Sequence, residues 1–234
     1  MQNPDVDDQK KLVRVLGYLR TTAFLPLVLG ADGTGNVYWF VDASFAVHKD
    51  MRSHTGAVMT FGHGAVVSMS TKQKIKTKSS TEAELVGADD ALPFNIWCYY
   101  FLQWQGYHAA GCNPITDPPK DGSNKAAELD KPRLGKTNVM FEDNTSAMQL
   151  MNNGKASSTK RTRHINIRYF LITNRIFTGE ITVQYCPTGD MVADFFTKPL
   201  QGSLFRKFRN TILGVSDADY ISYQLAYEAK RTPS

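Results

Sequence analysis

The alternation of apolar and polar positions predicts short helices and strands along the chain. Residues 9–21, QKKLVRVLGYLRT, repeat apolar side chains at helical spacing, which predicts a short amphipathic helix. The run VYWFVDASFA follows the turn ADGTGN and is rich in β-branched and aromatic residues, so it predicts a strand that contains Asp42. Residues 56–70, GAVMTFGHGAVVSMS, form two β-rich runs around Gly62, which favours an antiparallel hairpin.

The second half of the pattern predicts helices that alternate with strands. Ser79, Ser80 and Thr81 are N-cap candidates for a long helix, in which we expect a bend or an interruption near Pro93. The remaining predicted elements are a strand at 139–141, helices at 145–151 and 165–177, a strand at 181–185 and a helix at 189–197 capped by Asp190. This order of elements predicts a mixed α/β layer architecture.

The composition is that of a folded globular protein. Of the 234 residues, 42% are hydrophobic and 21% are charged, which excludes wholesale disorder and fibrous repeats. Residues 110–138 are rich in Pro, Gly, Asn, Lys and Asp and predict a flexible insertion. The sequence has no run of the ~20 apolar residues that a membrane helix needs and no signal peptide, so we expect an intracellular protein without membrane contact. Cys98, Cys112 and Cys186 are expected to be reduced and buried.

Positive charge is concentrated in two stretches. The formal net charge is +5 and the isoelectric point is about 9.0. Residues 51–81 and 155–179 contain no acidic residue but several lysines and arginines. Basic stretches of this kind favour an anionic partner such as nucleic acid, although two solvated surfaces without a partner would give the same pattern.

Acidic side chains occupy positions that a mixed α/β fold can bring together. They are Asp42 within a strand, Glu82 or Glu84 at a helix start, Asp143 at a strand end, and Asp190 or Asp194 near the last helix start. An acid inside an apolar strand is costly unless it is paired or binds a metal. Several carboxylates can hold two Mg²⁺ ions for phosphodiester hydrolysis. Glu82 and Glu84 differ by about 200° in direction on a helix, so only one of them can face such a site.

Seven segments carry a resemblance to a known family. They are FVDASFA, RSHTGAVM, STKQ, SSTEAELVGA, FEDNTSA, TRHINIRYFLI and CPTGDMVADFFTKPL, and their order resembles the C-terminal RNase H domain of Ty1/copia-type retrotransposon polyproteins. The preceding NPDVDDQKKLVRVLGYLRTT is similar to the segment that joins the reverse transcriptase to this domain. The resemblance implies a connecting segment at 1–36, an RNase H-like domain at 37–213 with an insertion at about 110–138, and a C-terminal tail at 214–234.

The resemblance also implies a fold, an activity and a set of site residues. The fold is an RNase H-like mixed sheet with an antiparallel hairpin, parallel strands and helices on both faces. The activity is hydrolysis of the RNA strand of RNA/DNA hybrids during reverse transcription, with two Mg²⁺ ions for which Mn²⁺ can substitute. The implied catalytic and metal-binding carboxylates are Asp42, Glu84, Asp143 and Asp194. Glu84 is preferred to Glu82 because RNase H domains place this glutamate directly before an aliphatic residue, and Asp194 to Asp190 because Asp190 is better explained as an N-cap.

Contact with a hybrid requires cations for phosphate and small polar groups for sugars. The candidates by residue type and location are Lys72, Gln73, Asn144, Ser146, Lys160, Arg161, Arg163 and His164. For His164, capping or orienting a helix is an equal alternative. The aromatic residues of the long helix, Trp97, Tyr99, Tyr100, Phe101 and Trp104, are expected in the core and not on a base-stacking surface.

Two other functions remain open from the sequence. The first is a catalytically idle nucleic-acid-binding remnant of a polyprotein. The sequence contains no reverse transcriptase motif, because Asp89-Asp90 lacks the aromatic residue that precedes the two aspartates of a polymerase. The second is a DNA-cutting transposase or integrase, which would leave the SSTEAE and TKPL segments unexplained. The expected partners are an RNA/DNA hybrid and the reverse transcriptase part of the same polyprotein. The expected location is a cytoplasmic virus-like particle or the nucleus.

Overall fold

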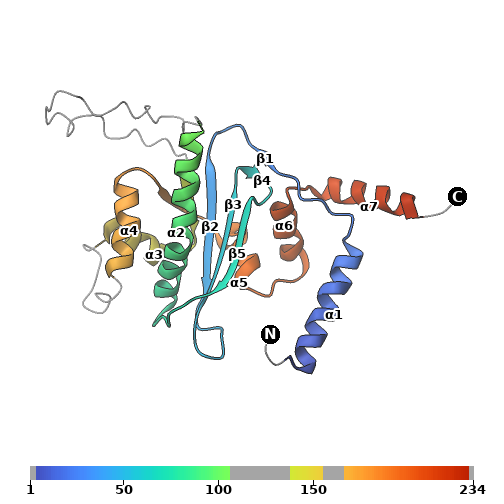
Figure 1. Ribbon diagram of the computed structural model, residues 1–234, viewed down its shortest axis with the longest axis horizontal. Coiled ribbons are helices and arrows are strands. Elements are labelled where there is room, and N and C mark those ends of the chain that lie inside the picture. The colour runs from blue at the N-terminus through green and yellow to red at the C-terminus, as the bar shows by residue number, and fades with distance from the viewer. Residues whose placement is uncertain (1–3, 106–137, 155–165, 232–234) are drawn as a thin grey trace.

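A computed structural model describes residues 4–105, 138–154 and 166–231, and one five-stranded sheet lies at the centre of this part of the chain (Figure 1). Its strands, in chain order, are β2 (Val37–Ser44), β3 (His54–Thr60), β5 (Val67–Lys72), β6 (Asn138–Glu142) and β7 (Thr182–Tyr185). They are arranged in the order β5-β3-β2-β6-β7. The pairs β2–β3 and β3–β5 are antiparallel, whereas β2–β6 and β6–β7 are parallel. The predicted mixed sheet is confirmed, including the antiparallel hairpin.

Helices cover both faces of the sheet, as predicted. In Figure 1, α2, α3 and α4 lie on one side of the strands and α5 and α6 on the other. The helices are α1 (Val6–Thr21), α2 (Ser80–Trp104), α3 (Thr145–Asn153), α4 (Asn166–Phe177), α5 (Asp194–Thr197), α6 (Gly202–Leu213) and α7 (Asp217–Arg231). A short two-stranded sheet of β1 (Gly30–Ala31) and β4 (Gly62–His63) accompanies them.

Each face of the sheet has its own hydrophobic core. Trp39, Val41 and Met140 point from the strands toward α2 and pack with Leu92. On the other face, Val58 packs against the fully buried Phe208 of α6. Successive residues of a strand point to opposite faces of the sheet. The two cores therefore show which face each other residue of these strands occupies.

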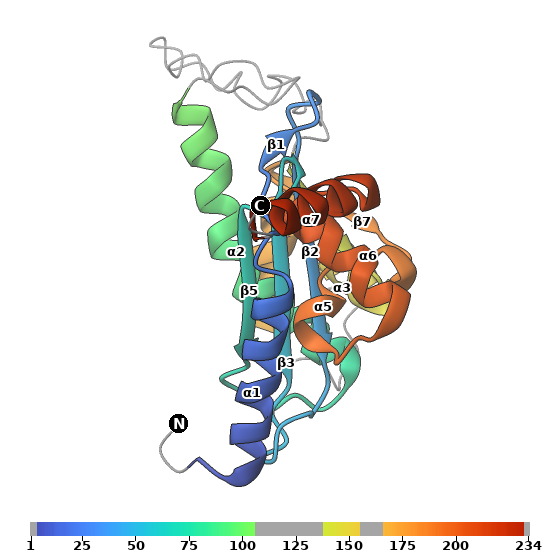
Figure 2. The same ribbon diagram turned by 90° about the vertical axis from the view of Figure 1, so that its right-hand side faces the viewer.

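The long helix α2 is one continuous element, and its second half differs from the sequence-based expectation. It continues through Pro93, so of the two predicted alternatives the interruption does not occur. Most aromatic side chains of its C-terminal half are exposed: Trp97 is 64% exposed and Trp104 is 82% exposed, and Tyr100 and Phe101 are exposed as well. The expectation that these aromatic residues belong to the core is therefore wrong for four of the five, with Tyr99 intermediate. Figure 2 shows the end of α2 leaning away from the strands that cover its first half.

The predicted helix at 189–197 is also wrong as a single element. A short 3₁₀ helix at Thr188–Asp190 is followed by α5, with Met191 to Ala193 between them. The side chain of Asp190 caps neither helix and pairs instead with Lys207, at 2.6 Å between Nζ and Oδ1. The salt bridge explains this acid better than helix capping does.

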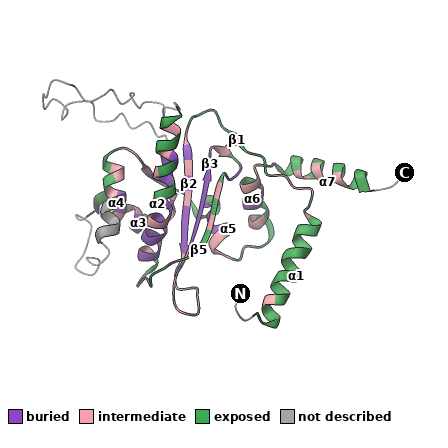
Figure 3. Cartoon of the chain, viewed as in Figure 1, coloured by how far each residue is buried: buried purple, intermediate pink, exposed green. Residues whose placement is uncertain are grey.

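The two ends of the described chain form helices at the periphery. Helix α1 begins with a capping box in which Asp5 and Asp8 bind each other's backbone amides, and it confirms the predicted helix at 9–21. Figure 3 shows that α1 is exposed along nearly its whole length. Helix α7 occupies part of residues 214–234.

Some sequence-based expectations fall outside the described residues. These include Cys112 and the predicted insertion at 110–138, except for Asn138, which begins β6. Cys98 and Cys186 are free and buried, as expected. Among the described residues, no helix is both long enough and apolar enough to cross a membrane.

Candidate metal centre

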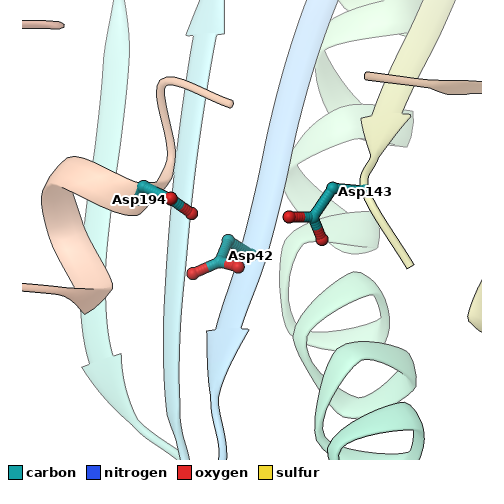
Figure 4. Close-up of side chains that lie close together, drawn as sticks. All are labelled: Asp42, Asp143 and Asp194. Carbon is teal, nitrogen blue, oxygen red and sulfur yellow. The ribbon is translucent and has the colours of Figure 1, made fainter. Parts of the chain in front are cut away.

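Three aspartates meet where β2 and β6 end side by side. These parallel strands are in register from Val37 with Asn138 to Phe40 with Phe141. Continuing this register by two residues places Asp42 beside Asp143. One carboxylate oxygen from each of Asp42, Asp143 and Asp194 lies within 4.8 Å of the others (Figure 4). We call these three residues the outer cluster.

A second acidic group shares one residue with the first. Glu84, Glu142 and Asp143 also offer one oxygen each within 4.8 Å of one another, and we call them the inner cluster. Glu142 lies on the same strand face as Met140, which is the face covered by α2, the helix that carries Glu84. Asp42 follows Val41 and so points to the opposite face, toward α5. The two clusters therefore approach from opposite faces of the sheet and share Asp143, which directly follows the last residue of β6.

The position of α5 depends on the absence of a side chain in the neighbouring strand. Gly56 lies directly opposite Asp42 in the β2–β3 pair. A Cβ atom at Gly56 would lie 2.7 Å from Cγ2 of Thr197 and 2.8 Å from the carbonyl oxygen of Ala193. Glycine thus allows α5 to approach the strand closely, and this approach brings Asp194 to Asp42.

A lysine ammonium group bridges two members of the outer cluster. Nζ of Lys198 lies 2.6 Å from Oδ1 of Asp194 and 3.3 Å from Oδ1 of Asp42. The hydroxyl of Thr197 donates to Oδ2 of Asp42. Burial raises the pKa of Asp194 to about 6, against the opposing effect of Lys198. Burial also disfavours the charge of Lys198, but the hydrogen bond to Asp194 and the charge of Asp42 outweigh it and raise the pKa of the ammonium group.

Among the described residues, no lysine or arginine forms an ion pair with the inner cluster. Glu142 is fully buried and Glu84 is 5% exposed, and Oε2 of each has no hydrogen-bond partner. The other oxygen of Glu142 accepts the amide of Asn144 at 3.1 Å. Burial, followed by the neighbouring charges, raises the pKa of Glu84 well above its usual range, and burial raises that of Glu142 to about 8.

Unpartnered buried carboxylate oxygens are unusual in folded proteins and call for an explanation. Oxygen ligands of this kind suit a hard divalent cation, which would offset the negative charge that burial makes costly. The residues present therefore fit a divalent metal ion, and both clusters could hold one.

The alternatives left open by the sequence differ clearly in geometry. Glu82 accepts the backbone amide of Lys78 at 2.8 Å and its own amide donates to the N-cap Ser79, so it stabilises the start of α2. Glu84 points in nearly the opposite direction from the helix and lies in the inner cluster. Asp194 lies in the outer cluster, whereas Asp190 pairs with Lys207.

The predicted nucleic-acid contacts lie in different environments. Ser146 is exposed, and Asn144 caps α3 by accepting the amides of Ser146 and Ala147. Lys72 pairs with Asp50, at 2.7 Å. Gln73 is fully buried, and its amide donates to Thr55 and to the carbonyl of Ala83, so the predicted contact of Gln73 with nucleic acid is not compatible with this structure. Lys160, Arg161, Arg163 and His164 lie outside the described residues.

Sequence reasoning missed three residues of the site. Glu142 directly precedes Asp143 in FEDN, and a charged residue at the end of an apolar strand could have drawn attention to it. Thr197 and Lys198 lie in the TKPL segment, which carries the resemblance but implies no role for either side chain. Their contacts with Asp42 span about 155 positions of sequence and could not be predicted from local pattern.

The fold is a five-stranded mixed sheet with helices on both faces and carboxylates gathered at the ends of its central parallel strands. No family model matches the chain. Its homologues are retrovirus-related Pol polyproteins from transposons, which confirms the predicted resemblance to retrotransposon polyproteins. It is 29% identical to those from transposons RE1 and RE2 of Arabidopsis thaliana, in each case over 91% of the chain, and 28% identical to that from transposon TNT 1-94 of Nicotiana tabacum over 88% of it.

The matched region is a small part of these relatives, since the chain spans 13% of the length of each. Among solved structures, the chain is similar to LC11-RNase H1, which was isolated from compost by a metagenomic approach. The TM-score is 0.40 at 11% identity, and the match covers 69% of this chain and 92% of the other.

Proposed function

We propose that this chain is the ribonuclease H of a copia-type retrotransposon and that it hydrolyses the RNA strand of RNA/DNA hybrids during reverse transcription. The observation that carries the proposal is the convergence of Asp42, Asp143 and Asp194, with one oxygen of each within 4.8 Å of the others. They come from the neighbouring parallel strands β2 and β6 and from α5, which are far apart in the sequence, so their meeting is a product of the fold and not of local sequence.

The residues of the two clusters have distinct tasks in this proposal. Asp42, Asp143 and Asp194 would hold one divalent ion, and Glu84 with Asp143 a second. Bound Mg²⁺ lowers the pKa of water and stabilises the charge that develops on a phosphodiester. Thr197 fixes one oxygen of Asp42, and Thr188 donates to Oδ2 of Asp143 at 3.0 Å, so both aspartates are held in orientation.

The same end of the sheet offers groups suited to a nucleic-acid backbone. Lys72 lies at the end of β5, opposite His54 of β3. His54 lies opposite Ser44 of β2, which is two residues after Asp42. Ser146 lies exposed in the first turn of α3, directly after Asp143. A cation and a hydroxyl on either side of the carboxylates suit phosphate and 2′-hydroxyl contacts without base readout.

The test is cleavage of a labelled RNA/DNA hybrid with Mg²⁺, with Mn²⁺ and with EDTA. We expect metal-dependent loss of the RNA strand only, and a fall of at least about a hundredfold in Asp42→Asn and Asp194→Asn because each loses a metal-binding carboxylate. Asp190→Asn is the matched control, since it makes the same chemical change in the same segment but at an exposed residue outside both clusters. Equal losses in Asp190→Asn and Asp194→Asn would contradict the assignment.

Two outcomes would replace the proposal. An intact hybrid that still binds the chain on a native gel would favour the catalytically idle binding remnant. Cleavage of duplex DNA in preference to the hybrid would favour a transposase or integrase. Both outcomes can be tested with the wild-type chain, before any variant is made.

We also propose that α1 contacts the reverse transcriptase part of the same polyprotein, in a virus-like particle in the cytoplasm or in the nucleus. Six apolar side chains of α1 are more than half exposed: Val6, Leu12, Val13, Val15, Leu16 and Leu19. An amphipathic helix normally buries its apolar face, so a partner is expected there. Co-purification with the upstream reverse transcriptase region, weakened by Leu16→Glu and unaffected by Arg14→Glu, tests this contact.

A further inference from the structure

Glu142 is a fifth acidic residue of the site, and the resemblance assigns it no role. It precedes Asp143, is fully buried, and lies on the face of the sheet covered by α2. A carboxylate at such a position replaces what would otherwise be an apolar side chain of the core. Its burial therefore requires a compensating interaction.

The contacts of Glu142 supply only half of this compensation. Oε1 accepts the amide of Asn144, whereas Oε2 has no hydrogen-bond partner. Glu84 and Asp143 each offer a carboxylate oxygen within 4.8 Å of one from Glu142, and Glu84 has the same deficiency at its own Oε2. Two buried carboxylates that face each other repel unless a proton or a cation lies between them.

The two clusters differ in the positive charge that the chain supplies. Lys198 forms ion pairs with Asp42 and Asp194 in the outer cluster. Within residues 4–105, 138–154 and 166–231, Glu84, Glu142 and Asp143 form no ion pair. A cation entering the outer cluster must compete with the ammonium group of Lys198, whereas no described residue places an ammonium or guanidinium group in an ion pair with the inner cluster.

We infer that Glu142 is a ligand of a divalent cation held with Glu84 and Asp143, and that this inner cation binds more tightly than the outer one. This inference deepens the proposed function and rests on it for the identity of the site. Asp143 is only partly buried and gives the inner cluster an opening toward solvent. The inner ion would then be resident, and the outer ion would exchange.

The test is direct binding of Mn²⁺ to the metal-free chain, followed by electron paramagnetic resonance and calorimetry. We expect two classes of bound Mn²⁺ of unequal affinity. Glu142→Gln keeps the shape of the side chain and the acceptor for Asn144, and it should weaken the tighter class about tenfold or more. Asp194→Asn should instead weaken the looser class, and Glu82→Gln should change neither.

A second measurement guards against misfolding of the variant. Metal binding to the folded state raises the unfolding temperature, so Mn²⁺ should shift the transition of Glu142→Gln by less than that of the wild type. Circular dichroism without metal reports whether the variant is folded. Equal Mn²⁺ affinities and equal shifts in a folded Glu142→Gln would overturn the inference.

The outcomes also separate this inference from the proposed function. A chain that binds Mn²⁺ through Glu142 but leaves the hybrid intact would retain the inference and refute the ribonuclease. Cleavage of the hybrid by the wild type, together with unchanged Mn²⁺ binding by Glu142→Gln, would support the ribonuclease and refute the inference about Glu142.

Discussion

A single side chain, Lys198, offsets part of the negative charge of the outer cluster. Asp42 is 2% exposed and its strand offers no counter-charge, so a salt bridge to a half-exposed lysine offsets part of the cost of burial. Removal of one partner of such a group leaves the others with uncompensated charge, which costs more than the pair itself contributes. A divalent cation can replace the lysine in this balance.

Lys198→Met should therefore destabilise the chain in EDTA and less in Mg²⁺. We expect the free energy of unfolding to fall by about 1–3 kcal/mol without metal, discounted for the partial exposure of the lysine. Urea unfolding followed by circular dichroism measures it. Lys207→Met is the matched control, because its partner Asp190 is exposed and such pairs contribute at most about 1 kcal/mol. A loss that Mg²⁺ does not reduce would contradict this account.

At the scale of elements, α2 shows what local pattern could and could not predict. Its start was predictable, because Ser79 and the acidic first turn are common signals. Burial of its second half was not, because exposure there depends on where the sheet stops and not on the helix sequence. The choice between Glu82 and Glu84 needed the resemblance, since periodicity allows either to face the strands.

This contrast along α2 is measurable. Leu92→Ala should lower the free energy of unfolding by about 2–5 kcal/mol, since Leu92 is 1% exposed in the core. Trp104→Gln should change it by no more than about 0.5 kcal/mol, because the indole is largely in solvent. Chemical denaturation of both variants checks the expectation. A large loss in Trp104→Gln would show that the side chain is covered in solution.

The packing of α5 on β3 provides a second prediction at this scale. In Gly56→Ala, the added methyl group would collide with the carbonyl oxygen of Ala193, so α5 must move away from the strand. We expect a loss of about 1–3 kcal/mol of stability and weaker cation binding at the outer cluster. Unfolding and Mn²⁺ titration of this variant measure both effects. Retention of both would mean that α5 adjusts without moving Asp194.

For the whole molecule, the order of strands and helices was predictable and the composition of the site only in part. Periodicity and turn residues predicted the hairpin and the mixed sheet, because these signals are local. The resemblance supplied Asp42, Glu84, Asp143 and Asp194. Burial of Gln73 and Glu142 depends on neighbours distant in sequence, so neither pattern nor resemblance indicated it.

The buried acids make the stability of the metal-free chain depend on pH. The pKa of Glu142 is raised to about 8, so the folded state holds its proton more tightly than the unfolded state does. Stability is then highest at acidic pH and falls between about pH 5 and pH 8, by up to about 1.4 kcal/mol per unit for this group. Thermal unfolding in EDTA across this range measures it. Glu142→Gln should flatten the dependence, and an unchanged slope would contradict the assignment.

The residues of the outer cluster are far apart in the sequence, and this separation affects the order in which the site forms during folding. The hydroxyl of Thr197 reaches Asp42 across 155 positions, and closing so long a loop follows the formation of local contacts such as the β2–β3 hairpin. During translation, a nascent chain can thus build the central strands well before α5 leaves the ribosome. Until then it has no Asp194 and no Lys198. The centre is therefore completed only when α5 has been synthesised and has docked, which delays its chemistry relative to the folding of the sheet.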